Sequence, residues 1–225
     1  MDEDERAKKR SAVIGDESHL SPEEALALID AQRGKAVRSL YVDPTMILGA
    51  WGAAWLFGFG AIYLASNGWL GTVMPAWTAG AIAGVLFAAA ALLSFGEQIC
   101  HGRGVEGPSR RTAAMYGWSW PLAFVGLFAL DLALEHQGLP SDLAPLLWTG
   151  SSLLAVGLLY LAGGMLFDDR LQYGLGVWVL VTGGASVAAG VPGNFAVLSL
   201  AGGGGFLVAA AVWRVRGWRA ERAPA

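Results

Sequence analysis

Long apolar runs separated by short polar stretches dominate the chain after residue 44. The first run, Thr45–Ala65, holds 21 residues without one charge. An α-helix rises about 1.5 Å per residue, so roughly 20 apolar residues cross a hydrocarbon layer of about 30 Å. Five further runs of similar length follow, at about Pro75–Phe95, Ala114–Leu134, Pro145–Phe167, Tyr173–Gly190 and Phe195–Trp213. The pattern predicts an all-α polytopic membrane protein with six transmembrane helices in residues 45–213.

A different pattern precedes the first run. Residues 1–20 mix charges with Ser, Gly and Ala, and we expect a disordered tail, because they cannot bury enough apolar surface to offset the entropy of ordering. Ser21 is followed by proline and then by Glu24, which is typical of a capped helix start. Beyond it the apolar residues Leu26, Ile29 and Val37 fall near one face. We therefore expect an amphipathic helix in residues 21–44 that lies on the membrane surface or docks a partner.

The positions of Lys and Arg predict the orientation. All 15 of them lie before the first run, in the second and fourth loops or after the last run, and the other three loops have none. Positive residues collect on the cytoplasmic side of membrane proteins. We therefore expect both termini in the cytoplasm, with residues 214–225 as a basic cytoplasmic tail. Arginine outnumbers lysine, and alanine and glycine abound, which favours a GC-rich bacterium and hence the bacterial cytoplasmic membrane.

Composition excludes several other classes. Only 15% of residues are charged and 55% are hydrophobic, where a soluble domain has about 25% and 45–50%. Acidic residues balance the basic ones at the N-terminus, so no nucleic-acid footprint is present. The single cysteine, Cys100, can form neither an intramolecular disulfide nor a cysteine-based zinc set. We expect a lipid-embedded protein with no metal and no cofactor.

No catalytic motif is found, so we expect no enzyme activity. The sequence Thr149-Gly150-Ser151-Ser152 is similar to the serine motif of rhomboid proteases, but those enzymes pair the serine with a histidine in a later span. The last two predicted spans contain no histidine. The middle of all six spans also lacks ionisable groups, which argues against a proton or ion pump.

Ionisable residues gather instead near the outer end of the third span. Asp131 lies one turn inside that end, Glu135 follows on the same face, and His136 begins the loop. Two carboxylates and an imidazole can hold a cation or receive a proton. A solvated outer rim is the more common explanation of such a cluster. In the inner half of the same span, Pro121 predicts a kink.

Small residues recur at the spacing of helix packing. Gly80 and Gly84 form a GxxxG pair in the second span, and Ala201, Gly205 and Ala209 form a ladder in the sixth. Such faces let helices approach closely. Packing within one bundle is favoured over a seam in a homo-oligomer.

The order of elements resembles, in outline, the membrane subunit of ABC-2 type exporters. Residues Ser21–Tyr41 stand where that family has an interfacial helix, and Gly96–Thr112 stand where its loop meets a separate ATPase subunit. The fifth loop, Val191–Asn194, is shorter than the re-entrant hairpin usual in that family. The chain also resembles the small six-span membrane proteins of GC-rich actinobacteria.

The resemblance implies a permease-like or transport-associated subunit that acts with a partner. Its substrate path would be lined by tryptophans and Pro121, and its partner contact would use both cytoplasmic segments. The path residues are Trp51, Trp55, Trp118, Trp120 and Trp178, and the contact residues are Leu26, Ile29, Val37, Arg103, Arg110 and Arg111. The alternative is a non-transporting membrane anchor or regulator that docks a soluble partner through its N-terminal helix.

Overall fold

The computed structural model describes residues 21, 23, 26, 28, 44–68, 75–101 and 108–222, and it divides into two units. In the first unit, Met1–Tyr41, the described residues Glu23, Leu26 and Leu28 are helical. Of the other residues in the helix predicted for 21–44, Ser21 is not helical and Pro44 begins the next helix, Pro44–Ser66, and the remainder lie outside the described residues. So do the predicted disordered tail and, of the predicted partner contacts, Ile29, Val37 and Arg103.

The second unit, Val42–Ala225, is helical throughout its regular elements, and its described residues form no strand. The elements are α3 (Pro44–Ser66), α4 (Ala76–His101), α5 (Pro108–His136), α6 (Ala144–Leu166), α7 (Arg170–Ala189), α8 (Gly193–Val197), the π-helix η1 (Leu198–Gly203) and α9 (Gly204–Arg222). Six segments are long and apolar enough to cross a membrane, with α8, η1 and α9 together making the sixth. The predicted all-α fold with six membrane-spanning helices is confirmed.

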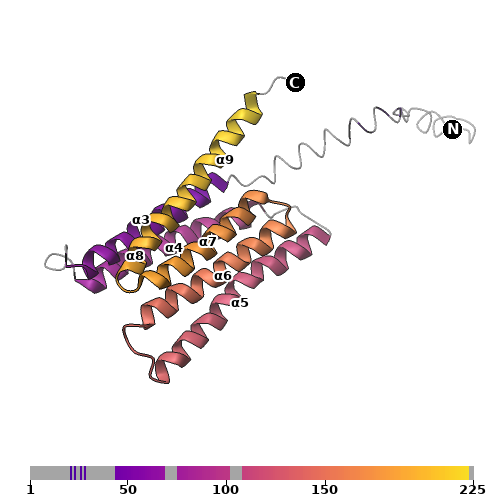
Figure 1. Cartoon of the computed structure of the whole chain (residues 1–225). Coiled ribbons are helices and arrows are strands. Elements are labelled where there is room, and N and C mark those ends of the chain that lie inside the picture. The colour runs from indigo at the N-terminus through magenta and orange to yellow at the C-terminus, as the bar shows by residue number, and fades with distance from the viewer. Residues whose placement is uncertain are drawn as a thin grey trace, which may run out of the picture. The chain divides into compact units, whose positions relative to one another are not determined.

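The spans lie in a row rather than in a ring (Figure 1). Their main contacts place them in the order α4, α3, α9, α7, α6 and α5, with α8 and η1 between α3 and α7. The helices α4 and α5 stand at the two edges, where α4 packs on α3 and α5 packs on α6. Large apolar side chains of both edge helices, such as Val85 and Val125, are exposed in the chain alone, as lipid-facing residues must be.

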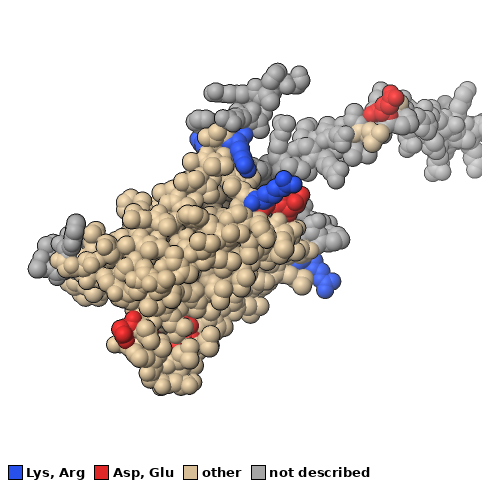
Figure 2. Space-filling model, in the orientation of Figure 1, with Lys and Arg blue, Asp and Glu red and all other residues tan. Residues whose placement is uncertain are grey.

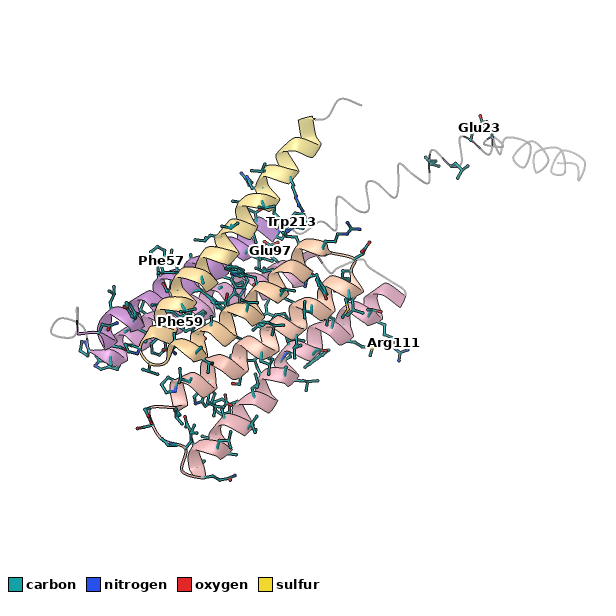
Figure 3. All side chains as sticks on the ribbon, viewed as in Figure 1. Glu23, Phe57, Phe59, Glu97, Arg111 and Trp213 are labelled. Carbon is teal, nitrogen blue, oxygen red and sulfur yellow. The ribbon has the colours of Figure 1, made fainter. Side chains whose placement is uncertain are left out.

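Charged side chains lie at the two ends of the helices, with an uncharged band between them (Figure 2). One end, here called the arginine end, carries Arg111, Arg170, Arg214 and Arg216, and Figure 3 shows Arg111 extending away from the helices. The opposite end, here called the arginine-free end, holds the connections after α3, α5 and α7 and has no Lys or Arg in its sequence.

The sixth span is not the single regular helix predicted from Phe195 onward. Helix starts earlier, at Gly193, and widens into the π-helix η1 before α9. Here the Ser199 hydroxyl donates to the Leu56 carbonyl of α3 at 2.7 Å, and the Trp178 indole of α7 donates to the Ala201 carbonyl at 2.9 Å. π-Helical turns inside α-helices are often found at functional sites, but here the hydrogen bonds tie three helices together.

The glycine run after Ser199 lets these helices approach one another closely. A Cβ on Gly202 would overlap the Trp55 ring, and one on Gly205 would overlap the Trp178 indole. A Cβ on Gly203 would lie 2.7 Å from the backbone nitrogen of Leu56. The run therefore forms the seam between α3, η1 and α7, here called the glycine seam, and its core includes the fully buried Leu198.

Candidate functional site in the seam between α5 and α6

The α5–α6 seam at the arginine-free end holds a buried carboxylate. Asp131 is 0% exposed, although α5 is an edge helix. It lies five residues before the last residue of α5, His136, which is about 7.5 Å along the helix axis. The solvated rim that the sequence favoured is therefore wrong for Asp131. The reason is that the residue faces α6, whereas the exposed Glu135 and His136 lie nearer the helix end.

Helical spacing brings five side chains to this seam. Phe128, Asp131 and Glu135 recur at intervals of three and four residues and so share one face of α5. Trp148 and Ser151, three residues apart, share the facing side of α6. The two helices are consecutive and antiparallel, because they are joined by the short connection after His136. We call these five residues the Asp131 site.

The serine holds one oxygen of the carboxylate and leaves the other without a partner. The Ser151 hydroxyl donates to Asp131 Oδ2 at 2.8 Å. Asp131 Oδ1 is buried and has no hydrogen-bond partner among the described residues. A buried polar atom without a partner costs free energy, and a buried charge without one costs more. The site is therefore incomplete as a permanently ionised carboxylate.

An indole ring spans the turns on either side of Asp131. Trp148 Nε1 donates to Glu135 Oε1 at 2.7 Å, one turn beyond Asp131 along α5. The same indole packs on Phe128, one turn before Asp131, with ring centroids 5.4 Å apart at an interplanar angle of 62°. The Trp148 indole thus contacts the turns of α5 on both sides of Asp131. Its hydrogen bond to a carboxylate on the exposed rim makes a clasp that can open.

The arginine end of α5 is attached by a second polar group, away from this site. The Tyr116 hydroxyl donates to the Leu159 carbonyl of α6 at 3.0 Å and accepts from Gln172 Nε2 of α7 at 3.1 Å. Trp120 packs edge-on against Tyr116 and Tyr160. Helix α5 is therefore held to α6 by polar groups at both ends.

The tryptophan path predicted from the sequence is not brought together. Trp51 donates to the Ser94 hydroxyl of α4 at 3.0 Å, and Trp55 is buried in the core against Phe206. Trp178 is bound to η1, and Trp118 is 68% exposed on edge helix α5. Because α3 and α5 are separated by α9, α7 and α6, their tryptophans cannot line one path within this chain. Pro121 is half-buried in an uninterrupted α5, and its kink stays a prediction.

The two sets of small residues have different surroundings. Gly205 packs on Trp178 and Ala209 is 6% exposed, so the set in the sixth span faces other helices of the bundle. Gly80 and Gly84 are exposed, and a Cβ at either would meet no described atom within 4 Å. We expected this pair to pack within the bundle. It does not do so among the described residues, because α4 turns another face toward α3.

Sequence reasoning missed three residues of interest. Ser151 drew attention only as part of a protease-like motif, and Trp148 was not named as a site residue. Asn194 is fully buried beside the last turn of α7, and neither its Oδ1 nor its Nδ2 has a partner among the described residues. A signal for Ser151 existed, since Asp131 and Ser151 lie at similar distances from the connection between two antiparallel helices.

No three His, Cys, Asp or Glu side chains among the described residues are grouped so that they could hold a metal ion. Beyond Asp131 and Glu135, the Asp131 site offers the Ser151 hydroxyl and the Trp148 indole.

The six apolar spans define the class, a multi-pass membrane protein. Comparison with protein-family models, with curated proteins and with solved structures gives no match.

Proposed function

We propose that the chain is a permease-like or transport-associated protein of the bacterial cytoplasmic membrane that acts with a partner. The observation that supports this is the full burial of Asp131 within a membrane-spanning helix. Ionisable residues inside spans are costly and rare, and they commonly mark substrate, ion or proton pathways.

The architecture supports the partner. The edge helices α4 and α5 each pack mainly on one neighbour, so either edge is available to lipid or to another subunit. Arg111 is exposed at the start of α5, in the segment expected to meet an ATPase subunit. In this proposal the arginine end faces the cytoplasm together with both termini, and the arginine-free end faces outward.

Transport measurements in vesicles test the proposal. Vesicles with wild-type chain and with Asp131→Asn are compared for uptake and efflux of a panel of labelled amino acids, sugars and organic cations. We expect at least one flux that requires the chain and falls about tenfold or more in the variant, as for residues on a transport pathway. Asp142→Asn, which alters an exposed carboxylate in the connection after α5, should leave that flux unchanged. A panel in which no flux depends on the chain contradicts transport.

The second candidate is a membrane anchor or regulator that docks a soluble partner. Leu26, which is helical and 60% exposed, supports it as an apolar contact residue. Replacing Leu26, Ile29 and Val37 together by Glu separates the two candidates. A docking protein would keep its melting temperature and lose only the partner. A transport subunit that needs this helix would lose flux even in proteoliposomes that hold no soluble regulator.

The orientation has its own test. Cys100 is the single cysteine and lies in the last turn of α4, at the arginine end. We expect an impermeant thiol reagent to leave it unmodified in intact cells and to modify it in opened membranes. Labelling of sealed cells at the rate seen in opened membranes would reverse the orientation.

A further inference from the structure

The Asp131 site holds one buried carboxylate oxygen that has no hydrogen-bond partner among the described residues. Asp131 Oδ2 is satisfied by Ser151, and Asp131 Oδ1 has no partner among the described residues. Such an atom in a span points to a ligand that the carboxylate takes up at Oδ1, because the ionised form would otherwise remain buried and unpaired.

The number of oxygen atoms at the site indicates which ligand it can bind. Calcium and magnesium, the cations that prefer carboxylate oxygens, take six or more oxygen ligands, and zinc takes four ligands. The site brings only the oxygens of Asp131, Ser151 and, at the rim, Glu135, and the last already accepts the Trp148 N–H. No grouping of three metal-ligating side chains occurs in the described residues. A proton needs only one oxygen, and it removes the charge that makes burial costly.

We propose that Asp131 is an exchangeable proton-binding site that opens toward the arginine-free side when Trp148 releases Glu135. This rests on the proposed function, because it names what the buried carboxylate of the same site binds. On loading, a hydronium ion from outside water gives its proton to Asp131 Oδ1, and water leaves. On release, the proton returns to water by the same route and the carboxylate is restored.

The neighbouring groups suit both states of the carboxyl. The Ser151 hydroxyl can donate to Oδ2 in either state, because the proton is carried by Oδ1. Glu135 is the nearest carboxylate on α5, and α6 carries no Asp, Glu, Lys, Arg or His in its sequence. No basic group from α6 therefore compensates the ionised form. His136 and Asp142 are exposed beyond the rim, where they meet water.

Carbodiimide labelling of the full chain in lipid nanodiscs tests the proposal. Dicyclohexylcarbodiimide enters apolar regions and reacts with the protonated carboxyl, and peptide mass spectrometry locates the adduct. We expect modification of Asp131 whose rate falls as the pH of the medium rises. Because this measurement uses the wild-type chain, it does not depend on the folding of any variant.

Variants of the clasp test the route. Trp148→Phe keeps a ring to pack on Phe128 but loses the N–H that binds Glu135. With a water-soluble carbodiimide, we expect this change to raise the rate of labelling of Asp131 about threefold to tenfold. This factor corresponds to the free energy of one interhelical hydrogen bond in a membrane protein. Trp77→Phe, at a 76% exposed tryptophan at the same end, should leave the rate unchanged.

Two outcomes would overturn the proposal. Asp131 that stays unlabelled at every pH is not protonated, and Asp131 labelled at a rate independent of pH does not exchange its proton. An unchanged rate in folded Trp148→Phe would exclude the route past the indole. Nanodiscs support no transport, so a failure of the flux measurements with normal labelling would refute the proposed function alone.

Discussion

The glycine seam and the α5–α6 seam solve the same problem, joining helices in an apolar medium, in opposite ways. In the glycine seam, Gly203 brings two backbones together and the indoles of Trp55 and Trp178 fill the space beside its neighbours. In the α5–α6 seam, polar groups at each end hold a helix that is otherwise exposed. Within the most apolar stretch of each span, 39% of the sixth is buried but only 6% of α5.

The difference separates the closely packed centre of the row from edge helix α5, which carries the Asp131 site. Without a hydrophobic driving force between helices in lipid, association depends on close packing and on hydrogen bonds. Close backbone packing is rigid, because moving one helix loses many contacts at once. A seam held by a few hydrogen bonds can open at small cost. The row therefore has a closely packed centre at α3, η1 and α7 and a less buried edge at α5, where the buried carboxylate lies.

The largest effect should come from filling the glycine seam. In Gly203→Leu the side chain must displace the α3 backbone at Leu56, where even a Cβ would lie at 2.7 Å. We expect a loss of about 3 kcal/mol or more in the free energy of unfolding in detergent, above the usual cost of overpacking. The neighbouring Gly204, whose Cβ would meet nothing within 4 Å, is the matched control, and Gly204→Ala should be neutral. Equal losses in both variants would contradict the close approach of α3 and η1.

A smaller loss is expected from the polar seam. Ser151→Ala leaves Asp131 with no donor at Oδ2 and should cost about 1–3 kcal/mol of unfolding free energy. Ser152→Ala changes the neighbouring hydroxyl and should cost less than half as much. Ser151→Thr should restore most of the loss, because it retains the hydroxyl. Thermal unfolding at matched detergent concentrations measures all three. A neutral Ser151→Ala would mean that the hydrogen bond to Asp131 adds nothing to the seam.

The sequence was sufficient to predict the number and class of the spans but not how the helices pack against one another. Uncharged runs of about 20 residues can only be satisfied as helices in lipid, so both number and class followed directly. Which face of α4 packs on α3 could not be inferred from Gly80 and Gly84, because α4 is apolar all round. The row order and the π-turn depend on interhelical contacts between residues far apart in sequence. For that reason the sequence alone could not show that the tryptophans of α3 and α5 lie too far apart to line one path.

Asp131 shows the same limit at the level of one site. Its position near the end of a span was evident, but exposure depends on which helix covers it. Glu135 lies only four residues away and is exposed, so local sequence could not distinguish the two carboxylates. The antiparallel connection to α6 supplies the missing information, since it brings Ser151 and Trp148 opposite them.

The interhelical hydrogen bond of the π-turn should have a modest effect. Trp178→Phe keeps an aromatic ring beside Gly205 but loses the donor to the Ala201 carbonyl. We expect about 0.6–1.7 kcal/mol less unfolding free energy, the range of intramembrane hydrogen bonds. Trp118→Phe, at an exposed tryptophan on α5, should change it by less than half of that. A larger effect at Trp118 than at Trp178 would place the structural role on the edge helix.

The smallest effect is expected on α4. Gly80→Ala and Gly84→Ala add a Cβ that meets no described atom within 4 Å, so the only expected effect on the monomer is the better helix propensity of Ala, a gain of about 0.5–1 kcal/mol in unfolding free energy at each position. The same unfolding assay, run at several protein concentrations, measures this. A loss above 1.5 kcal/mol that depends on concentration would show that a second copy covers this face.

The most direct test of proton binding at Asp131 is the infrared spectrum of the full chain in nanodiscs, recorded as a difference between low and high pH. Wild type should show the carbonyl stretch of a protonated carboxyl in an apolar site at low pH, shifted in heavy water and lost at high pH. The band should be absent from Asp131→Asn and present in Asp142→Asn. A spectrum in which Asp131→Asn keeps the band, or in which wild type shows none, would contradict a proton site at Asp131.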